Sequence, residues 1–248
     1  MRLRRGPRTR GFPPSGNSAS SLHLGWRLPP GAGHLVEAAV TLEVTQPPVV
    51  DHLYFWALQM GFPGAGAAHL GLQWNRAFPG FGAVNWGGYA IDGSLLRGTE
   101  SGLPSTPGDP NTRDYAWEPR RAFRLRVHRA DDGLWRGDVT DVQTGASTAV
   151  RELIAASPFL TDLMVWSEVF ARCDDPSVTA RWSDFVAVDE RGERFAPVAL
   201  VVNYQSYAAG GCANTTSVLD DRGGVLQITN AQRTTEGGAI LQPRARMA

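Results

Sequence analysis

The chain has 248 residues, a length that suits one large β domain or two small ones. Its 24 basic and 24 acidic side chains give a formal net charge of +0, which argues against nucleic-acid and membrane-surface proteins, because these carry a basic excess. Every basic residue is an arginine, so Schiff-base chemistry, a phosphate-loop lysine and a lysine general base are excluded.

The first twenty residues differ in composition from the rest. Residues 1–20 carry five arginines followed by Pro, Gly and Ser, and almost no apolar side chains. The arginines resemble the start of an export signal, but no apolar stretch follows them. We therefore predict a disordered or misassigned basic tail over 1–20. No run of apolar residues anywhere is long enough to span a membrane.

From about residue 34 the pattern is that of β-strands separated by turn dipeptides such as Asp92-Gly93 and Asp132-Gly133. In Ala122–Arg129 the residues Phe123, Leu125 and Val127 alternate with polar ones, as in a half-buried antiparallel strand. The expected strands are 35–45, 52–60, 68–75, 122–129, 134–142, 163–170, 178–188 and 198–204.

Many short strands without intervening helices predict an all-β fold, an antiparallel jelly-roll β-sandwich with at most one short helix, at Val150–Ala156. We expect a single domain over 21–235, followed by a flexible C-terminal tail over 236–248. The acidic, Gly- and Pro-rich stretch 99–114 is the one long loop.

Aromatic residues next to amides are the most suggestive candidates for a binding site. Indole faces beside hydrogen-bonding groups suit sugar rings, although sandwich cores also use tryptophan. In the glycine-rich segment 80–89 we expect little room to bury the aromatic and amide side chains together. The candidate ligand-binding residues are Trp74, Asn75, Asn85, Trp86, Tyr89, Arg97, Tyr115 and Trp117.

Glu168 is the leading candidate for catalysis. Alternation places it on one strand face with Met164, Trp166 and Phe170, where an unpaired carboxylate is costly to bury. It therefore either pairs with an arginine or lies at a cleft. Glycoside cleavage needs two carboxyl groups roughly 5–9 Å apart, and Glu100 is the candidate partner, with Asp138 and Asp141 as alternatives.

Metal and cysteine chemistry give weaker signals. The five histidines have no metal-binding spacing, and no cofactor is expected. A structural calcium ion at Asp109, Asn111 and Asp114 is the one weak candidate.

Cys173 and Cys212 are either a structural disulfide or two free buried thiols, since their sequence context is compatible with both.

Several segments, in this order, resemble a bacterial family catalogued as domain of unknown function 3472, common in secreted actinobacterial proteins. The resemblance covers roughly residues 19–230 and is carried by ASSLHLGW (19–26), PPGA (29–32), YFWALQMGF with HLGLQW (within 54–74), YAW (115–117), WRGDVTDVQTG (135–145), WSE (166–168), Cys173 and CAN (212–214). It implies a lectin- or glucanase-like (concanavalin-like) jelly roll, usually exported to the cell surface or exterior, with the two cysteines bridged. The family has no established reaction.

Three functions compete. The first is a non-catalytic carbohydrate-binding protein that recognises a poly- or oligosaccharide through the aromatic and amide residues. The second is a carbohydrate-active hydrolase or lyase with Glu168 as acid or base. The third is a surface module that binds another protein, because sandwiches serve all three purposes.

Overall fold

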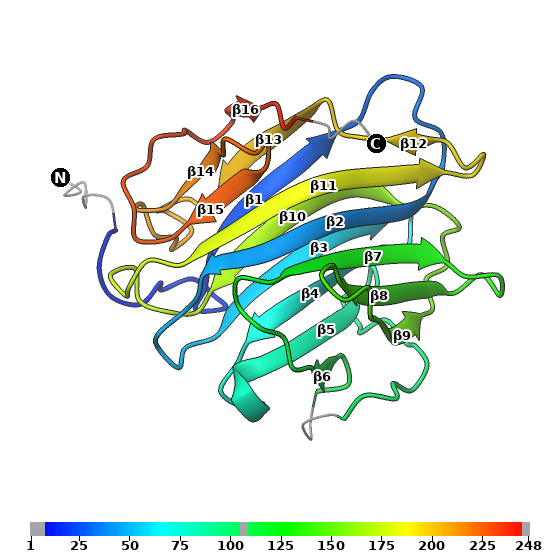
Figure 1. Cartoon of the computed structure of the whole chain (residues 1–248), viewed down its shortest axis with the longest axis horizontal. Coiled ribbons are helices and arrows are strands. Elements are labelled where there is room, and N and C mark those ends of the chain that lie inside the picture. Colours follow the sequence, from blue (N-terminus) through cyan, green and yellow to red (C-terminus); the bar gives the residue numbers. More distant parts are fainter. Residues whose placement is uncertain (1–7, 105–108, 245–248) are drawn as a thin grey trace.

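The computed structural model describes residues 8–104 and 109–244, and these form two antiparallel β-sheets stacked face to face (Figure 1). The predicted all-β sandwich is confirmed. In spatial order, sheet A contains β16 (Ile240–Leu241), β13 (Ala199–Tyr204), β1 (Ser20–Arg27), β10 (Thr161–Val169), β3 (Tyr54–Phe62), β4 (Gly66–Trp74), β5 (Gly82–Tyr89) and β6 (Thr112–Asp114).

Sheet B covers one face of sheet A, with β2 and β11 lying over β3 and β10 (Figure 1). Its order is β14 (Thr216–Leu219), β15 (Val225–Ile228), β11 (Thr179–Asp189), β2 (Leu35–Gln46), β7 (Ala122–Arg129), β8 (Trp135–Asp141) and β9 (Ser147–Leu153), with β12 (Arg194–Phe195) pairing beside β11. The one helical turn among the described residues is the 3₁₀ turn η1 (Pro79–Phe81).

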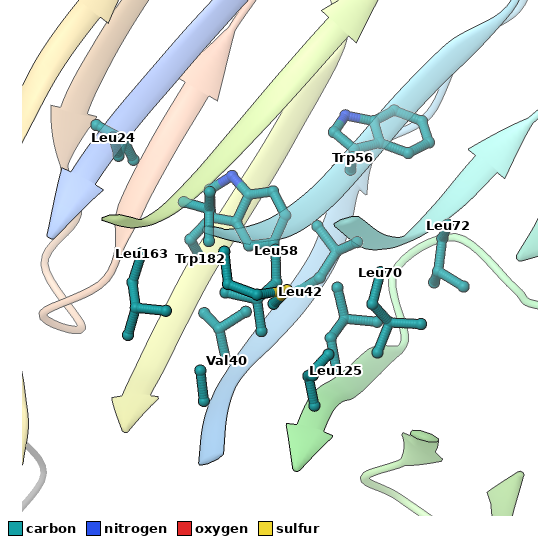
Figure 2. Packing of buried hydrophobic residues seen from close by; sticks show 14 of the residues in the cluster. Leu24, Val40, Leu42, Trp56, Leu58, Leu70, Leu72, Leu125, Leu163 and Trp182 are labelled. Carbon is teal, nitrogen blue, oxygen red and sulfur yellow. The ribbon is translucent and has the colours of Figure 1, made fainter. Parts of the chain in front are cut away.

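The core lies between the sheets and follows the alternation in the sequence. On β7, Phe123, Leu125 and Val127 are buried, as predicted. Figure 2 shows Leu42 and Leu125 of sheet B packing toward the side chains that sheet A contributes. Each fully buried leucine contributes about 1.5–3 kcal/mol, so this layer holds the two sheets in their relative position.

Two segments differ from the prediction. Residues 147–153 form strand β9 instead of a short helix, because Val150 and Leu153 point into the core and the backbone pairs with β8. Residues 82–89 form the inner strand β5, whose glycines allow close packing. A Cβ on Gly88 would lie 2.1 Å from the Ala67 carbonyl oxygen.

The ends of the chain are more ordered than expected. Residues 1–7 and 245–248 lie outside the described part, but residues 8–19 are hydrogen-bonded along the sandwich, and β1 begins at Ser20. Within the expected C-terminal tail, β16 pairs with β13. These backbone hydrogen bonds explain the difference, since composition alone shows only that the segments are polar.

Cys173 and Cys212 form a disulfide with a Cα–Cα distance of 5.6 Å. The bridge joins the loop after β10 to the loop after β13. Disulfides are typical of proteins that mature in an oxidising compartment. In the described residues no helix has the length and apolar character needed to cross a membrane.

Trp86 provides a test of the core. Its side chain is fully buried, its Nε1 donates to the Trp135 carbonyl oxygen at 3.1 Å, and Gly137 packs against its ring. We expect Trp86→Ala to lower the free energy of unfolding by about 3–5 kcal/mol in chemical denaturation, because it leaves a large cavity.

Ile91→Ala is the matched control, since Ile91 is 79% exposed, and its effect should stay within about 0.5 kcal/mol. A Trp86→Ala protein as stable as the parent would show that the indole does not pack in the core.

Candidate functional site

The face of sheet A that points away from sheet B carries a groove of about 490 Å³. Polar and aromatic side chains from five neighbouring strands, β1, β10, β3, β4 and β5, line it together with the N-terminal segment. The lining residues are Asn17, Ser21, His23, Leu53, Phe55, Gln59, Ala67, His69, Gln73, Tyr89, Trp166, Glu168 and Phe170. The candidate catalytic residue Glu168 is thus part of the lining of this groove.

Strand register sets the geometry of the groove. Glu168 on β10 pairs with Phe55 on β3, which pairs with Gln73 on β4. Neighbouring strands lie about 4.8 Å apart, so the Cα atoms of Glu168 and Gln73 are about 10 Å apart. The two long polar side chains therefore flank the ring of Phe55 and can reach toward one bound group.

Glu168 is half-buried and shares the groove with Trp166 and Phe170, as alternation along the strand predicted. It forms no ion pair with any arginine of the described residues, so the alternative of a structural Arg–Glu pair does not apply. Burial raises the pKa of Glu168, and hydrogen bonds from Asn17 and Ser21 oppose that rise. Asn17 Nδ2 donates to Glu168 Oε1 at 2.7 Å.

Two glutamines present their amide groups to the groove in a defined orientation. Trp166 Nε1 donates to Gln59 Oε1 at 2.9 Å, and Asn75 Nδ2 donates to Gln73 Oε1 at 3.1 Å. Because an indole N–H can only donate, the orientation of the Gln59 amide is fixed. Both NH2 groups lack a hydrogen-bond partner among the described residues and remain donors for a ligand.

The two groove histidines do not supply positive charge near neutral pH. His69 lies edge-on to the rings of Phe55 and Trp166, and burial lowers its pKa to about 4. Burial also lowers the pKa of His23, whose Nδ1 has no hydrogen-bond partner. Among the described residues that line the groove, no cation therefore accompanies the Glu168 carboxyl group at neutral pH.

The predicted aromatic and amide residues do not form one surface. Trp86 and Trp117 are buried between the sheets, where Trp117 Nε1 donates to the Gln73 carbonyl oxygen at 2.9 Å. Trp74 stacks on Phe81 and donates to a backbone carbonyl. Tyr115 is half-buried against Phe123.

Three of the predicted residues do belong to the groove face. Tyr89 lines the groove and is exposed, and Asn75 orients Gln73. Asn85 lies in the same strand row as Trp166, where its Nδ2 donates to Thr112 Oγ1 at 2.9 Å.

The predicted partners of Glu168 are elsewhere. Glu100 follows the segment that bonds to β9 at the edge of sheet B, and Arg97 is exposed on the same segment. Glu168 is thus the single carboxyl group among the described groove-lining residues. The sequence did not single out Gln59, Gln73, His69 or Asn17 as functional residues.

The residues named as weak calcium candidates make hydrogen bonds within the protein or end a strand. Asp109 accepts hydrogen bonds from the backbone N–H groups of Asn111 and Thr112, while Asn111 Oδ1 accepts from Arg151. Asp114 lies at the end of β6. No cluster of three or more His, Cys, Asp or Glu side chains suited to a metal ion occurs in residues 8–104 and 109–244.

No protein-family model and no curated protein matches the chain. Several solved structures resemble it at low sequence identity. Scytalido-glutamic peptidase, bound to a peptide-based transition state analogue, is 9% identical over 86% of this chain and 98% of its own, with a TM-score of 0.46. SCP-B, a member of the eqolisin family of peptidases, in complex with the tripeptide Ala-Ile-His, is 8% identical over 85% and 98%, with a TM-score of 0.44.

Peanut lectin in complex with a nine-residue peptide is also similar, with 10% identity over 79% of this chain and 83% of the lectin and a TM-score of 0.32. At these scores a function for the chain has to be argued from its own residues. The resemblance to domain of unknown function 3472 stays a prediction.

The prediction of a non-catalytic carbohydrate-binding protein was wrong. The physical reason lies in the chain itself, because Trp86 and Trp117 are buried and cannot stack on a sugar. Glycoside cleavage needs two carboxyl groups, and the described residues of the groove supply only Glu168, because Glu100 lies at the edge of the other sheet.

The lowered pKa of the partly buried His69 predicts a pH effect on stability. Its pKa is about 4 in the folded protein against an ordinary value of 6.5, so the unfolded chain takes up the proton first as the pH falls. Stability should decrease as the pH falls from about 6.5 to about 4, and this part of the decrease should disappear in His69→Gln. Thermal unfolding followed by circular dichroism across that range measures it.

The control is His34→Gln, because the His34 side chain is 65% exposed. Parallel stability curves for the parent and His69→Gln would contradict a buried, neutral His69.

Proposed function

We propose that this chain is a hydrolase that cleaves amide bonds in extended polypeptide segments bound in the groove of sheet A. Glu168 is the general base that activates water, and the NH2 group of Gln73 stabilises the oxyanion. The observation that carries the proposal is a half-buried carboxyl group without a cationic partner, in one strand row with an amide donor.

The surroundings of Glu168 suit a general base. Burial raises its pKa toward the working range of an acid–base catalyst, which strengthens it as a proton acceptor. The N–H of Asn17 that donates to Oε1 fits the ionised carboxylate, which can only accept. Glu168 is therefore placed to act in its ionised form, with burial setting its basicity.

Gln73 supplies the complementary group. With Oε1 held by Asn75, its NH2 group faces the groove, and side-chain amides are established oxyanion donors. The fixed NH2 group of Gln59 adds a second donor farther along β3. A carbonyl group bound between Glu168 and Gln73 then has a base on one side and a donor on the other.

The reaction follows from this arrangement. Glu168 takes a proton from water as the water oxygen bonds to the amide carbon, and the negative charge on the carbonyl oxygen is stabilised by Gln73. The protonated Glu168 then gives its proton to the departing nitrogen as the C–N bond breaks. The products are a carboxylic acid and an amine, and Glu168 returns to its starting form.

A polypeptide fits the groove better than other polymers. Among the described residues, the lining has no cation at neutral pH to hold phosphates or acidic sugars, and it has one carboxyl group where glycoside cleavage needs two. Phe55, Trp166 and Phe170 supply apolar surface for side chains, while the two amides supply donors for a backbone. The disulfide supports a place of action outside the cytosol, at the cell surface or beyond.

Hydrolysis of a reduced, carboxymethylated polypeptide tests the proposal, with new termini identified by mass spectrometry in ¹⁸O-labelled water. We expect the parent to place one ¹⁸O in each new carboxyl group. Glu168→Gln should lower the rate by about 10²–10⁴-fold and Gln73→Ala by about 10²–10³-fold.

Glu100→Gln is the matched control and should leave the rate unchanged, because Glu100 lies away from the groove. A parent protein that releases no new termini between acidic and neutral pH, or a fully active Glu168→Gln, would contradict the proposal.

A further inference from the structure

The N-terminal segment, residues 8–19, is held between the two loops that the disulfide joins. On one side, the backbone N–H of Cys173 donates to the Gly11 carbonyl oxygen at 2.9 Å. On the other, the N–H of Ala213 donates to the Arg8 carbonyl oxygen at 2.6 Å. The segment therefore bonds directly to a cysteine-bearing loop at each flank.

Further contacts fix the rest of the segment. Gly210 approaches it so closely that a Cβ would lie 2.5 Å from the Ser15 nitrogen, and its φ of +89° also favours glycine. The N–H of Cys212 donates to Ser20 Oγ at 2.9 Å, where the segment enters β1. The path of the chain from residue 8 to residue 20 is thus set by the disulfide loops.

The segment delivers Asn17 to the groove in one orientation. Asn17 Oδ1 accepts hydrogen bonds from the backbone N–H of Ala19 at 3.2 Å and from Ser15 Oγ at 3.0 Å. With its oxygen occupied in this way, the Nδ2 group points to Glu168 Oε1, 2.7 Å away. Asn17 thus supplies this oxygen with a donor from outside the sheet, in addition to the hydrogen bond that Ser21 of β1 makes to the same carboxyl group.

We propose that Asn17 is a positioning residue that holds Glu168 in its ionised, groove-facing form, and that the Cys173–Cys212 disulfide maintains this contact by clamping the N-terminal segment. The role in catalysis rests on the proposed function. The contact itself, and its effect on the Glu168 carboxyl group, do not.

Ser21 on β1 is the other side chain that hydrogen-bonds to Glu168, and it is unchanged in the Asn17 variants. The titratable side chains that face it across the groove are His23 on β1, His69 on β4 and Tyr89 on β5. In the loop after β10, Arg172 pairs with Asp174, and Asp175 lies 3.8 Å from His52 in the loop that precedes β3. A change of pKa on removing Asn17 therefore reports the lost hydrogen bond.

The test measures the pKa of Glu168 directly by carboxyl ¹³C NMR, with Glu168→Gln used to assign the signal. Asn17→Ala should raise that pKa by roughly half a unit to one unit, because a donor to the ionised form is lost. The acid limb of the pH–rate profile should move to higher pH by the same amount. Asn17→Ser keeps a donor at this position and should recover part of both shifts.

Asn203→Ala is the matched control, since Asn203 is exposed on β13 beside β1, and it should change neither readout. The double variant Cys173→Ser/Cys212→Ser should raise the Glu168 pKa in the same direction, with little further shift when Asn17→Ala is added. The single variant Asn17→Ala keeps the test decisive if the double variant does not fold.

An unchanged Glu168 pKa in Asn17→Ala overturns the inference. A rate of hydrolysis that increases at every pH in Asn17→Ala also overturns it, because the N-terminal segment would then obstruct the groove instead of positioning Glu168. If Asn17→Ala shifts the Glu168 pKa but the parent protein has no hydrolytic activity, the positioning contact stands and the proposed function is rejected. The failure of the inference is in this way distinguished from the failure of the proposed function.

Discussion

The register between β10, β3 and β4 is the constraint on which the groove depends. In a strand, neighbouring residues point to opposite faces, so a slip of one residue would turn Glu168 and Gln73 into the core and expose the apolar set. Large side chains on the inner face, among them Trp56, Leu58 and Leu72, prevent such a slip because they are fully enclosed by sheet B. The packing of the sandwich therefore fixes the spacing of the polar groups on its outer face.

The separation of an apolar inner face from a polar outer face also explains why the tryptophans and the polar groups serve different purposes. Trp56, Trp86 and Trp182 fill the space between the sheets and use their N–H groups for internal hydrogen bonds where partners are available. Trp166 is the exception, since it lies on the outer face and fixes the amide of Gln59. The buried indoles thus fill the space between the sheets, whereas the indole of Trp166 on the outer face orients the side chain of Gln59.

Much of the fold could be predicted from the sequence, because alternation is a local property. Ala122–Arg129 has the predicted bounds, and the face of Glu168 followed from its apolar neighbours. The groove could be predicted only in part. Whether Trp86 faces inward depends on the pairing of β5 with β4, and glycines that seemed to expose the backbone in fact allow tight packing. The contact between Asn17 and Glu168 joins residues 151 positions apart, which no local pattern reveals.

The position of β1 has a consequence for the order in which the protein forms during synthesis. β1 leaves the ribosome first, yet its two neighbours in sheet A are β10 and β13, which are made far later. The loop bearing Cys212 follows Ser20, its hydrogen-bond partner, by 192 residues. Contacts of such long separation form late and slowly. When Glu168 has just emerged, β13 and Cys212 are still to be made, so the groove, with Asn17 held against Glu168, is completed only after Cys212 has emerged.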